Sequence, residues 1–95
     1  MSKTFTFAAS HQLTHLPEGH KCKRLHGHTY SVTVNLAAPE LNEDGFVVDF
    51  AELDQVGEFI RTNLDHQHLN AVMAFMPTCE LIARFIAERF PGLPI

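Results

Sequence analysis

The sequence lacks the features of membrane, secreted and nucleic-acid-binding proteins. No apolar run approaches the roughly 18 residues that a membrane-spanning helix needs, and no charged segment followed by an apolar core marks a secretory signal. Positive charge is not in excess either, since the formal net charge is −4 with histidine neutral, which excludes a typical basic surface for nucleic acid. We therefore expect a cytoplasmic protein with neither a membrane nor a nucleic-acid partner.

Cysteine is also scarce, and histidine is not. Cys22 and Cys79 are the only two cysteines and lie in unlike contexts, so the sequence predicts no disulfide framework. Hydrophobic residues make up 45% of the 95 residues and charged residues 19%, which is typical of a globular chain. Five of the seven histidines fall within eighteen consecutive residues, and we look for function there; they are His11, His15, His20, His26 and His28.

Two segments alternate polar and apolar residues with the period of two that is typical of a half-buried strand. Residues 4–11 place Phe5, Phe7 and His11 on one face, and residues 26–36 place His26 and His28 on a face that continues with apolar residues. About fourteen residues connect the two predicted strands. A connection of that length is often functional.

Two helices are predicted in the second half of the chain. Asp49 begins the first, with Glu52 three residues later completing a capping-box pattern, and Thr78 begins the second as its N-cap. The fold class is therefore α+β, in the order strand, strand, helix, helix. Because a two-stranded hairpin is only marginally stable alone, we expect further strands or oligomerisation to complete the sheet.

The histidines of the predicted strands form a candidate metal site. His26 and His28 share one strand face, about 6.6 Å apart along the strand, and antiparallel pairing would bring His11 to the same end of the hairpin. Three imidazole ligands with an open fourth position are typical of a catalytic zinc site. The alternative, an H-x-H pair that decorates a polar face, is less favoured because this face is otherwise apolar. His15 and His20 are interpreted as solvated loop residues.

Other candidate residues lie outside the histidine cluster. Cys22 is flanked by Lys21, Lys23 and Arg24, and nearby cations favour the reactive thiolate; an ordinary free cysteine is the alternative. Cys79 is interpreted as a packing residue.

A carboxylate beside an imidazole ends the first predicted helix. Asp65 could fix the tautomer of His66 and raise its basicity, although adjacent side chains often point apart. At the start of the second helix, a cap and a favourable interaction with the helix dipole account fully for Thr78 and Glu80.

Several motifs together resemble the 6-pyruvoyl-tetrahydropterin synthase family. The segments, in order, are F-T-F-A-A-S-H-Q-L, P-E-G-H-K-C-K-R-L-H-G-H, G-F-V-V-D-F, L-D-H-Q-H-L-N and P-T-C-E. The C-x3-H-G-H spacing is similar to the bacterial branch, the 6-carboxy-5,6,7,8-tetrahydropterin synthases of the queuosine pathway. The pyruvoyl-forming branch has a longer spacing at this point.

The resemblance implies roles for the candidate residues. His11, His26 and His28 match zinc ligands. Cys22 matches a catalytic proton acceptor that works with the pair Asp65 and His66. Thr78 and Glu80 match residues near the pterin. The resemblance also implies the tunnelling fold, in which subunits form a barrel, usually a trimer stacked as a hexamer, with active sites at subunit interfaces. Because the family continues with two more strands, we expect residues 1–95 to be one synthase domain that is incomplete at its C-terminal end.

The implied reaction converts 7,8-dihydroneopterin triphosphate to 6-carboxy-5,6,7,8-tetrahydropterin, with release of acetaldehyde and triphosphate. Two alternatives stay open. A 6-pyruvoyl-tetrahydropterin synthase would eliminate triphosphate without cleaving a carbon–carbon bond, and a non-catalytic zinc-binding module would bind the metal without turnover.

Overall fold

The computed structural model describes residues 1–95 and confirms the α+β class. The elements are strands β1 (Ser2–His11), β2 (His26–Asn35) and β3 (Gln67–His68), helices α1 (Asp54–Asn63), α2 (Leu69–Val72) and α3 (Cys79–Glu88), and the 3-10 turns η1 (Lys21–Lys23) and η2 (Phe50–Leu53). None of the helices has the length and hydrophobicity required to cross a membrane.

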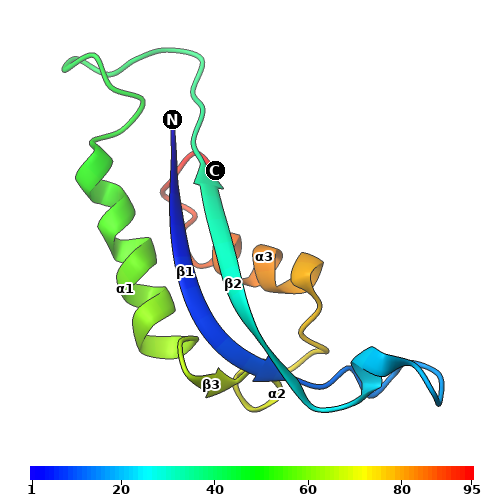
Figure 1. Ribbon diagram of the computed structural model, residues 1–95. Coiled ribbons are helices and arrows are strands. Elements are labelled where there is room, and N and C mark those ends of the chain that lie inside the picture. The colour runs from blue at the N-terminus through cyan, green and yellow to red at the C-terminus, as the bar shows by residue number, and fades with distance from the viewer.

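A long curved hairpin forms the framework of the molecule (Figure 1). β1 and β2 pair antiparallel over their full length, from Ser2 opposite Asn35 to His11 opposite His26. This register follows from the alternating pattern, because a shift of one residue would turn every apolar side chain to the wrong face. The pairing therefore places the histidine-bearing ends of both strands side by side.

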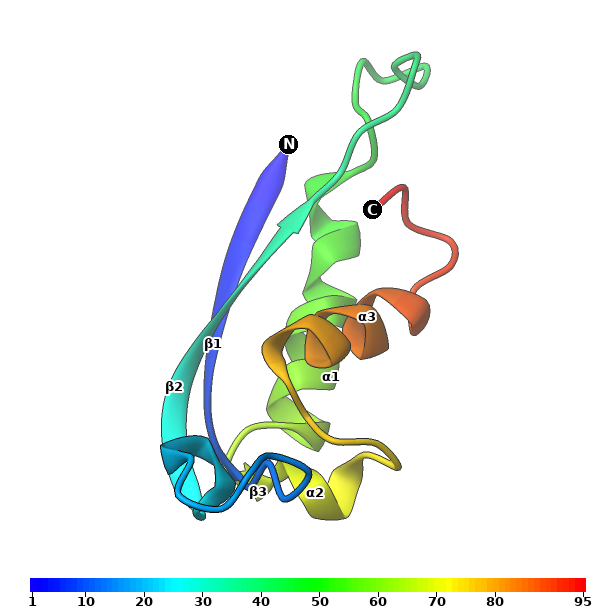
Figure 2. The ribbon, with the colours of Figure 1, turned by 90° about the vertical axis from the view of Figure 1, so that its right-hand side faces the viewer.

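Both long helices pack on one face of the sheet, so the protein has two layers (Figure 2). Each helix turns an apolar stripe toward the sheet: Leu53, Val56, Ile60 and Leu64 are buried before, along and just after α1, and Ile82 and Ile86 are buried along α3. Burial of each such side chain contributes about 1.5–3 kcal/mol. The opposite face of the hairpin carries small polar residues and no helix.

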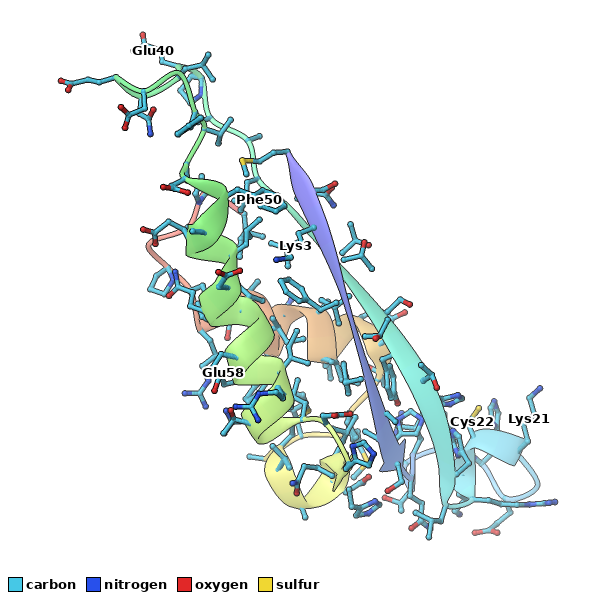
Figure 3. The ribbon with its side chains drawn as sticks, turned by 60° about the vertical axis from the view of Figure 1, so that its left-hand side comes forward. Lys3, Lys21, Cys22, Glu40, Phe50 and Glu58 are labelled. Atoms are coloured by element: carbon cyan, nitrogen blue, oxygen red, sulfur yellow. The ribbon has the colours of Figure 1, made fainter.

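The start of α1 differs from the predicted capping box. The Asp49 carboxylate accepts a hydrogen bond from the Ala51 amide at 3.0 Å, as an N-cap does, but the Glu52 side chain accepts from Gln55 instead of returning to Asp49. The first turn is consequently the 3-10 turn η2, and the α-helix begins at Asp54. Lys3 ties this start to β1, because its ammonium lies 3.3 Å from Asp54 and over the Phe50 ring (Figure 3).

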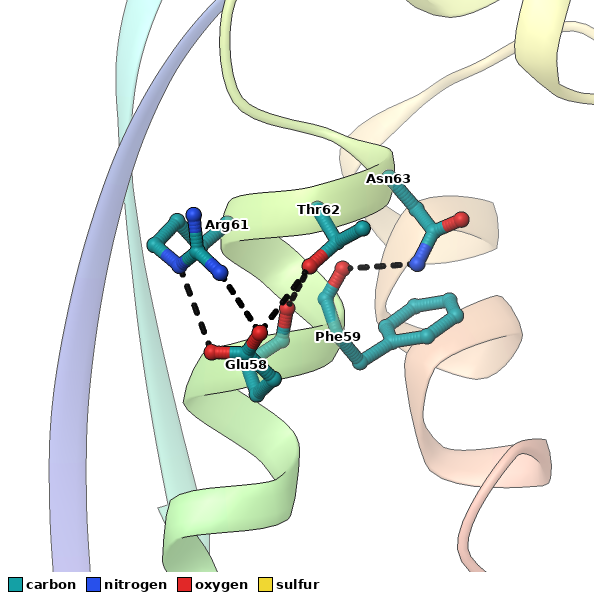
Figure 4. A network of polar contacts seen from close by, with 5 residues as sticks. All are labelled: Glu58, Phe59, Arg61, Thr62 and Asn63. Carbon is teal, nitrogen blue, oxygen red and sulfur yellow. Dashed lines mark hydrogen bonds and ion pairs between the residues drawn. The ribbon is translucent and has the colours of Figure 1, made fainter.

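The exposed face of α1 is stabilised by contacts within the helix (Figure 4). The Arg61 guanidinium donates to the Glu58 carboxylate three residues earlier, and this bond lowers the pKa of Glu58. Thr62 and Asn63 donate to the main-chain carbonyls of the preceding turn, at 2.7 and 3.0 Å. Such exposed pairs each contribute only a few tenths of a kcal/mol, so this face has a local role.

The segment after α1 contains two short elements that the sequence did not predict. His66 adopts a positive φ of 59°, and the chain then forms β3 parallel to β1, with Gln67 opposite Ala9 and His68 opposite Ser10. The sheet order is therefore β2-β1-β3. α2 follows at once, and together these elements return the chain to the histidine-bearing end of the hairpin.

Candidate metal centre

The three predicted metal ligands meet at one end of the hairpin. His11 ends β1, and His26 and His28 begin β2 on the same face. Their ring centroids lie 4.4 to 5.1 Å apart, and one nitrogen from each ring lies within 4.8 Å of the other two. The three histidines could therefore hold a metal ion.

In two of these rings, a hydrogen bond at Nδ1 leaves Nε2 with a free lone pair that can bind a metal. His11 Nδ1 lies 2.8 Å from the Pro77 carbonyl, and His26 Nδ1 lies 2.7 Å from the Arg24 carbonyl. A carbonyl only accepts, so each Nδ1 carries the proton of a neutral ring and each Nε2 carries a lone pair. These two Nε2 atoms face each other at 2.8 Å. Two lone pairs at this distance repel each other, and a cation bound by both nitrogens would remove that repulsion, so the two rings are oriented as metal ligands are.

Burial differs sharply across the cluster. His11 is only 4% exposed, and desolvation lowers its pKa although the Pro77 carbonyl opposes this; nearby histidines lower it further. His28 is exposed and has no hydrogen-bond partner. The site is therefore closed toward the core and open to solvent at His28, as a site that admits a substrate must be.

Cys22 lies beside this opening. It sits in η1, at the end of the molecule where β1 ends and β2 begins (Figure 3). It lines an open hollow of about 380 Å³ together with Lys21, Gly27, His26 and His28. The Cys22 amide donates to His20 Nδ1 at 3.1 Å. His20 is thus exposed, as expected, but it also caps the turn that carries the cysteine.

The side chains of Asp65 and His66 do contact each other. His66 Nδ1 lies 3.1 Å from one Asp65 carboxylate oxygen, and the other oxygen accepts from the Ala8 amide at 2.9 Å. The Ala8 bond, followed by the contact with His66, lowers the pKa of Asp65. The His66 side chain is 82% exposed. Its positive φ allows it to turn back toward the neighbouring carboxylate.

His66 and Cys22 line two different hollows. His66 lines an open hollow of about 550 Å³ with His28 and Gly27, beside the ends of β1 and β3. Only Gly27 and His28 belong to both hollows. His28 therefore lies between the candidate thiol and the candidate carboxylate–imidazole pair.

The segment before α3 caps that helix, as predicted, and also orients one of the candidate metal ligands. Thr78 Oγ1 accepts from the Leu81 amide at 3.3 Å and so caps α3 as predicted, while the preceding Pro77 carbonyl orients His11. Glu80 is exposed and makes no hydrogen bond or ion pair. Cys79 is exposed within one chain, so it is not a residue of the buried core, although it shares a face of α3 with Ile82 and Ile86 and lines an apolar hollow with them.

Two residues near the site, Tyr30 and Asn70, were not predicted as site residues from the sequence. Tyr30 is two residues after His28 on the same strand face, so the alternating pattern could have identified it. Its hydroxyl lies 3.2 Å from His11 Nδ1, and burial raises the pKa of Tyr30 to about 12.

Asn70 accepts from the Gln12 amide at 2.9 Å and donates to the Gln12 carbonyl at 2.8 Å. This two-bond clamp fixes the chain just after His11, and nothing in the sequence pattern indicates it.

Comparison with known proteins agrees with this geometry. A family model described as 6-pyruvoyl tetrahydropterin synthase matches residues 1–92. The structure of the 6-pyruvoyl tetrahydropterin synthase of Caenorhabditis elegans covers 98% of this chain with a TM-score of 0.79 and 25% identity, and the chain covers 76% of it. The architecture is therefore that of a tunnelling-fold protein.

Curated relatives are similar over most of the chain. A 6-carboxy-5,6,7,8-tetrahydropterin synthase of Synechocystis sp. is 41% identical over 96% of this chain, and one of Bacillus subtilis is 33% identical over 93%. A dihydroneopterin monophosphate aldolase of Pyrococcus furiosus is 36% identical over 94%. The chain spans 78%, 62% and 75% of these three relatives, respectively.

Proposed function

The chain belongs to the 6-pyruvoyl tetrahydropterin synthase family, and from that premise we propose that it is a zinc-dependent carbon–carbon lyase of queuosine (7-deazapurine) biosynthesis. It would convert 7,8-dihydroneopterin triphosphate and one molecule of water to 6-carboxy-5,6,7,8-tetrahydropterin, acetaldehyde and triphosphate. The observation that carries the proposal is the pair of opposed Nε2 lone pairs of His11 and His26, 2.8 Å apart and beside the exposed His28. The relatives named for this reaction support the choice of substrate.

The choice of zinc rests on the donor set. Three neutral imidazoles with an open fourth position suit Zn²⁺, and the Pro77 and Arg24 carbonyls hold two of the rings in the tautomer that leaves Nε2 free. Zinc bound there would supply Lewis acidity toward the hydroxyl groups of the substrate side chain.

The residues around the cluster divide the proton transfers between them. Cys22, beside His26 and His28 in its hollow, would accept a proton from the substrate side chain as a thiolate. His66 would hold and return a proton on the other side of His28, with Asp65 keeping the ring oriented through its 3.1 Å contact. Thr78 and Glu80 would lie near the pterin ring, with the carboxylate of Glu80 free of other partners.

Three other outcomes are separable from this one. A 6-pyruvoyl-tetrahydropterin synthase would release triphosphate but no acetaldehyde. An aldolase would act on dihydroneopterin monophosphate instead, an alternative suggested by the similarity to the Pyrococcus furiosus protein. A zinc-binding module would leave both the triphosphate and the monophosphate unchanged.

The decisive experiment incubates the zinc-loaded protein separately with 7,8-dihydroneopterin triphosphate and with the monophosphate. We expect acetaldehyde, triphosphate and a carboxylated pterin from the triphosphate, identified by mass spectrometry and an aldehyde-trapping reagent. Release of triphosphate alone, or turnover of the monophosphate in preference, would contradict the proposed reaction and identify the alternative that holds.

A further inference from the structure

The contact between Tyr30 and His11 assigns a role to a residue outside the predicted site. We propose that Tyr30 is a positioning residue for the metal ligand His11: together with the Pro77 carbonyl, its hydroxyl fixes the imidazole so that Nε2 points into the cluster. This inference rests on the proposed metal site, and it adds a residue to which neither a motif nor a relative gave a function.

Proton accounting defines what the Tyr30 hydroxyl does. His11 Nδ1 donates its proton to the Pro77 carbonyl at 2.8 Å, and the Tyr30 oxygen lies 3.2 Å from the same nitrogen. The nitrogen has one proton, so the phenol oxygen receives a share of it as a second acceptor. Two acceptors on different elements, β2 and the segment before α3, then restrain rotation of the ring about its long axis.

The Tyr30 ring is itself held in place by the core. It stacks on Phe7 with centroids 4.8 Å apart and planes 12° apart, and Phe7 is only 2% exposed. Its other contacts are edge-on, with His28 at 5.5 Å and His11 at 6.0 Å. Tyr30 thus connects the packed interior to two of the three ligands, and the hydroxyl position follows from the packing of the ring.

The test compares Tyr30→Phe, which keeps the ring and removes the hydroxyl, with the wild-type protein. We expect Zn²⁺ affinity, measured by competition with a chromogenic chelator, to fall about 10-fold, the low end of the range for outer-sphere substitutions, since Pro77 remains in place. We also expect a changed visible absorption band of bound Co²⁺, which reports the geometry of the ligands. The melting temperature of the metal-free protein should stay close to that of the wild type.

The control is Ser31→Ala, which removes a hydroxyl from the next residue, on the opposite face of the strand. It should change neither Zn²⁺ affinity nor the Co²⁺ spectrum. Unchanged affinity and spectrum in Tyr30→Phe would overturn the role of Tyr30 while leaving the metal site intact. If the wild-type protein itself bound no Zn²⁺, the metal site and the role of Tyr30 would both be refuted.

Discussion

At the scale of single residues, His28 separates metal binding from folding. It is exposed and has no hydrogen-bond partner in the protein, so its removal costs the fold little, yet it supplies one of three candidate ligands. We predict about one zinc per wild-type chain and strong loss of zinc in His28→Ala, measured by elemental analysis after gel filtration. Full zinc content in that variant would refute the ligand assignment.

Cys22 distinguishes an enzyme from a zinc-binding module. Its thiol lines the hollow beside His26 and His28 but is not one of the three ligands. Cys22→Ala should therefore keep its zinc while turnover of 7,8-dihydroneopterin triphosphate falls by roughly 100-fold or more, the usual scale for a lost acid–base group. The measurement is a steady-state assay on protein of known zinc content.

Cys79→Ala is the matched control for the cysteine experiment. Cys79 is exposed and lines the apolar hollow between β2 and α3, away from the hollow that contains Cys22, His26 and His28, so we expect little change in turnover. A Cys22→Ala protein that turned over substrate at the wild-type rate would favour the module.

At the scale of elements, periodicity accounts for what the sequence could predict. β1, β2, α1 and α3 each have ten residues in the structure, long enough to show an alternating or helical pattern, and the phase of β1 and β2 was sufficient to bring the three histidines together. β3 and α2 have two and four residues, too few for any period. They form because the turn at His66 brings the chain back beside β1, a tertiary effect with no local signal.

In the site too, some features were predictable from the sequence and others depend on the folded chain. The ligands were predictable because side chains carry the pattern, whereas the two groups that orient them are the main-chain carbonyls of Pro77 and Arg24. Any residue has a carbonyl, so only the folded chain reveals which ones face a histidine. The contact between Asp65 and His66 likewise depends on a backbone conformation that residues other than glycine seldom adopt.

Asp65 also links elements, and this link predicts a pH dependence. Its carboxylate, just after α1, accepts from the Ala8 amide in β1, and this bond, with the contact to His66, lowers its pKa. A lowered pKa in the folded state means that the ionised group stabilises the fold above its unfolded pKa of about 3.9. This stabilisation is lost as pH falls through the lower, folded value.

We therefore compare Asp65→Asn with wild type by urea unfolding between about pH 6 and about pH 2. The amide oxygen can still accept from Ala8 but does not titrate, so the stability advantage of the wild type should shrink as pH falls. Asp44→Asn, whose side chain makes no hydrogen bond, is the control and should show no such trend. A difference between wild type and Asp65→Asn that stays constant over this range would show that the Ala8 bond does not depend on the charge.

At the scale of the whole molecule, the long outer edge of β2 is unpaired. The sheet order β2-β1-β3 leaves the outer edge of β2 without a neighbour, although all ten residues of that strand are extended. Next to this edge, two hollows of about 120 and 300 Å³ lie between β2 and α3, and mostly apolar side chains line both. Val32, Ala83 and Ile86 belong to both hollows, so they form one continuous apolar groove along the strand.

An unpaired strand edge beside an apolar groove favours association with another chain, and the family resemblance implies trimers or hexamers. We predict that sedimentation velocity will show an oligomer or larger assemblies at micromolar concentration rather than a monomer.

Ala83→Lys tests the groove. Residue 83 is exposed within one chain, so the fold should survive, but a charge there should shift the distribution of species toward the monomer. Ala71→Lys, an exposed position on α2 outside the groove, should leave it unchanged. A wild-type protein that sediments as a monomer and unfolds cooperatively would show that the edge needs no partner, and the proposed assembly would then be wrong.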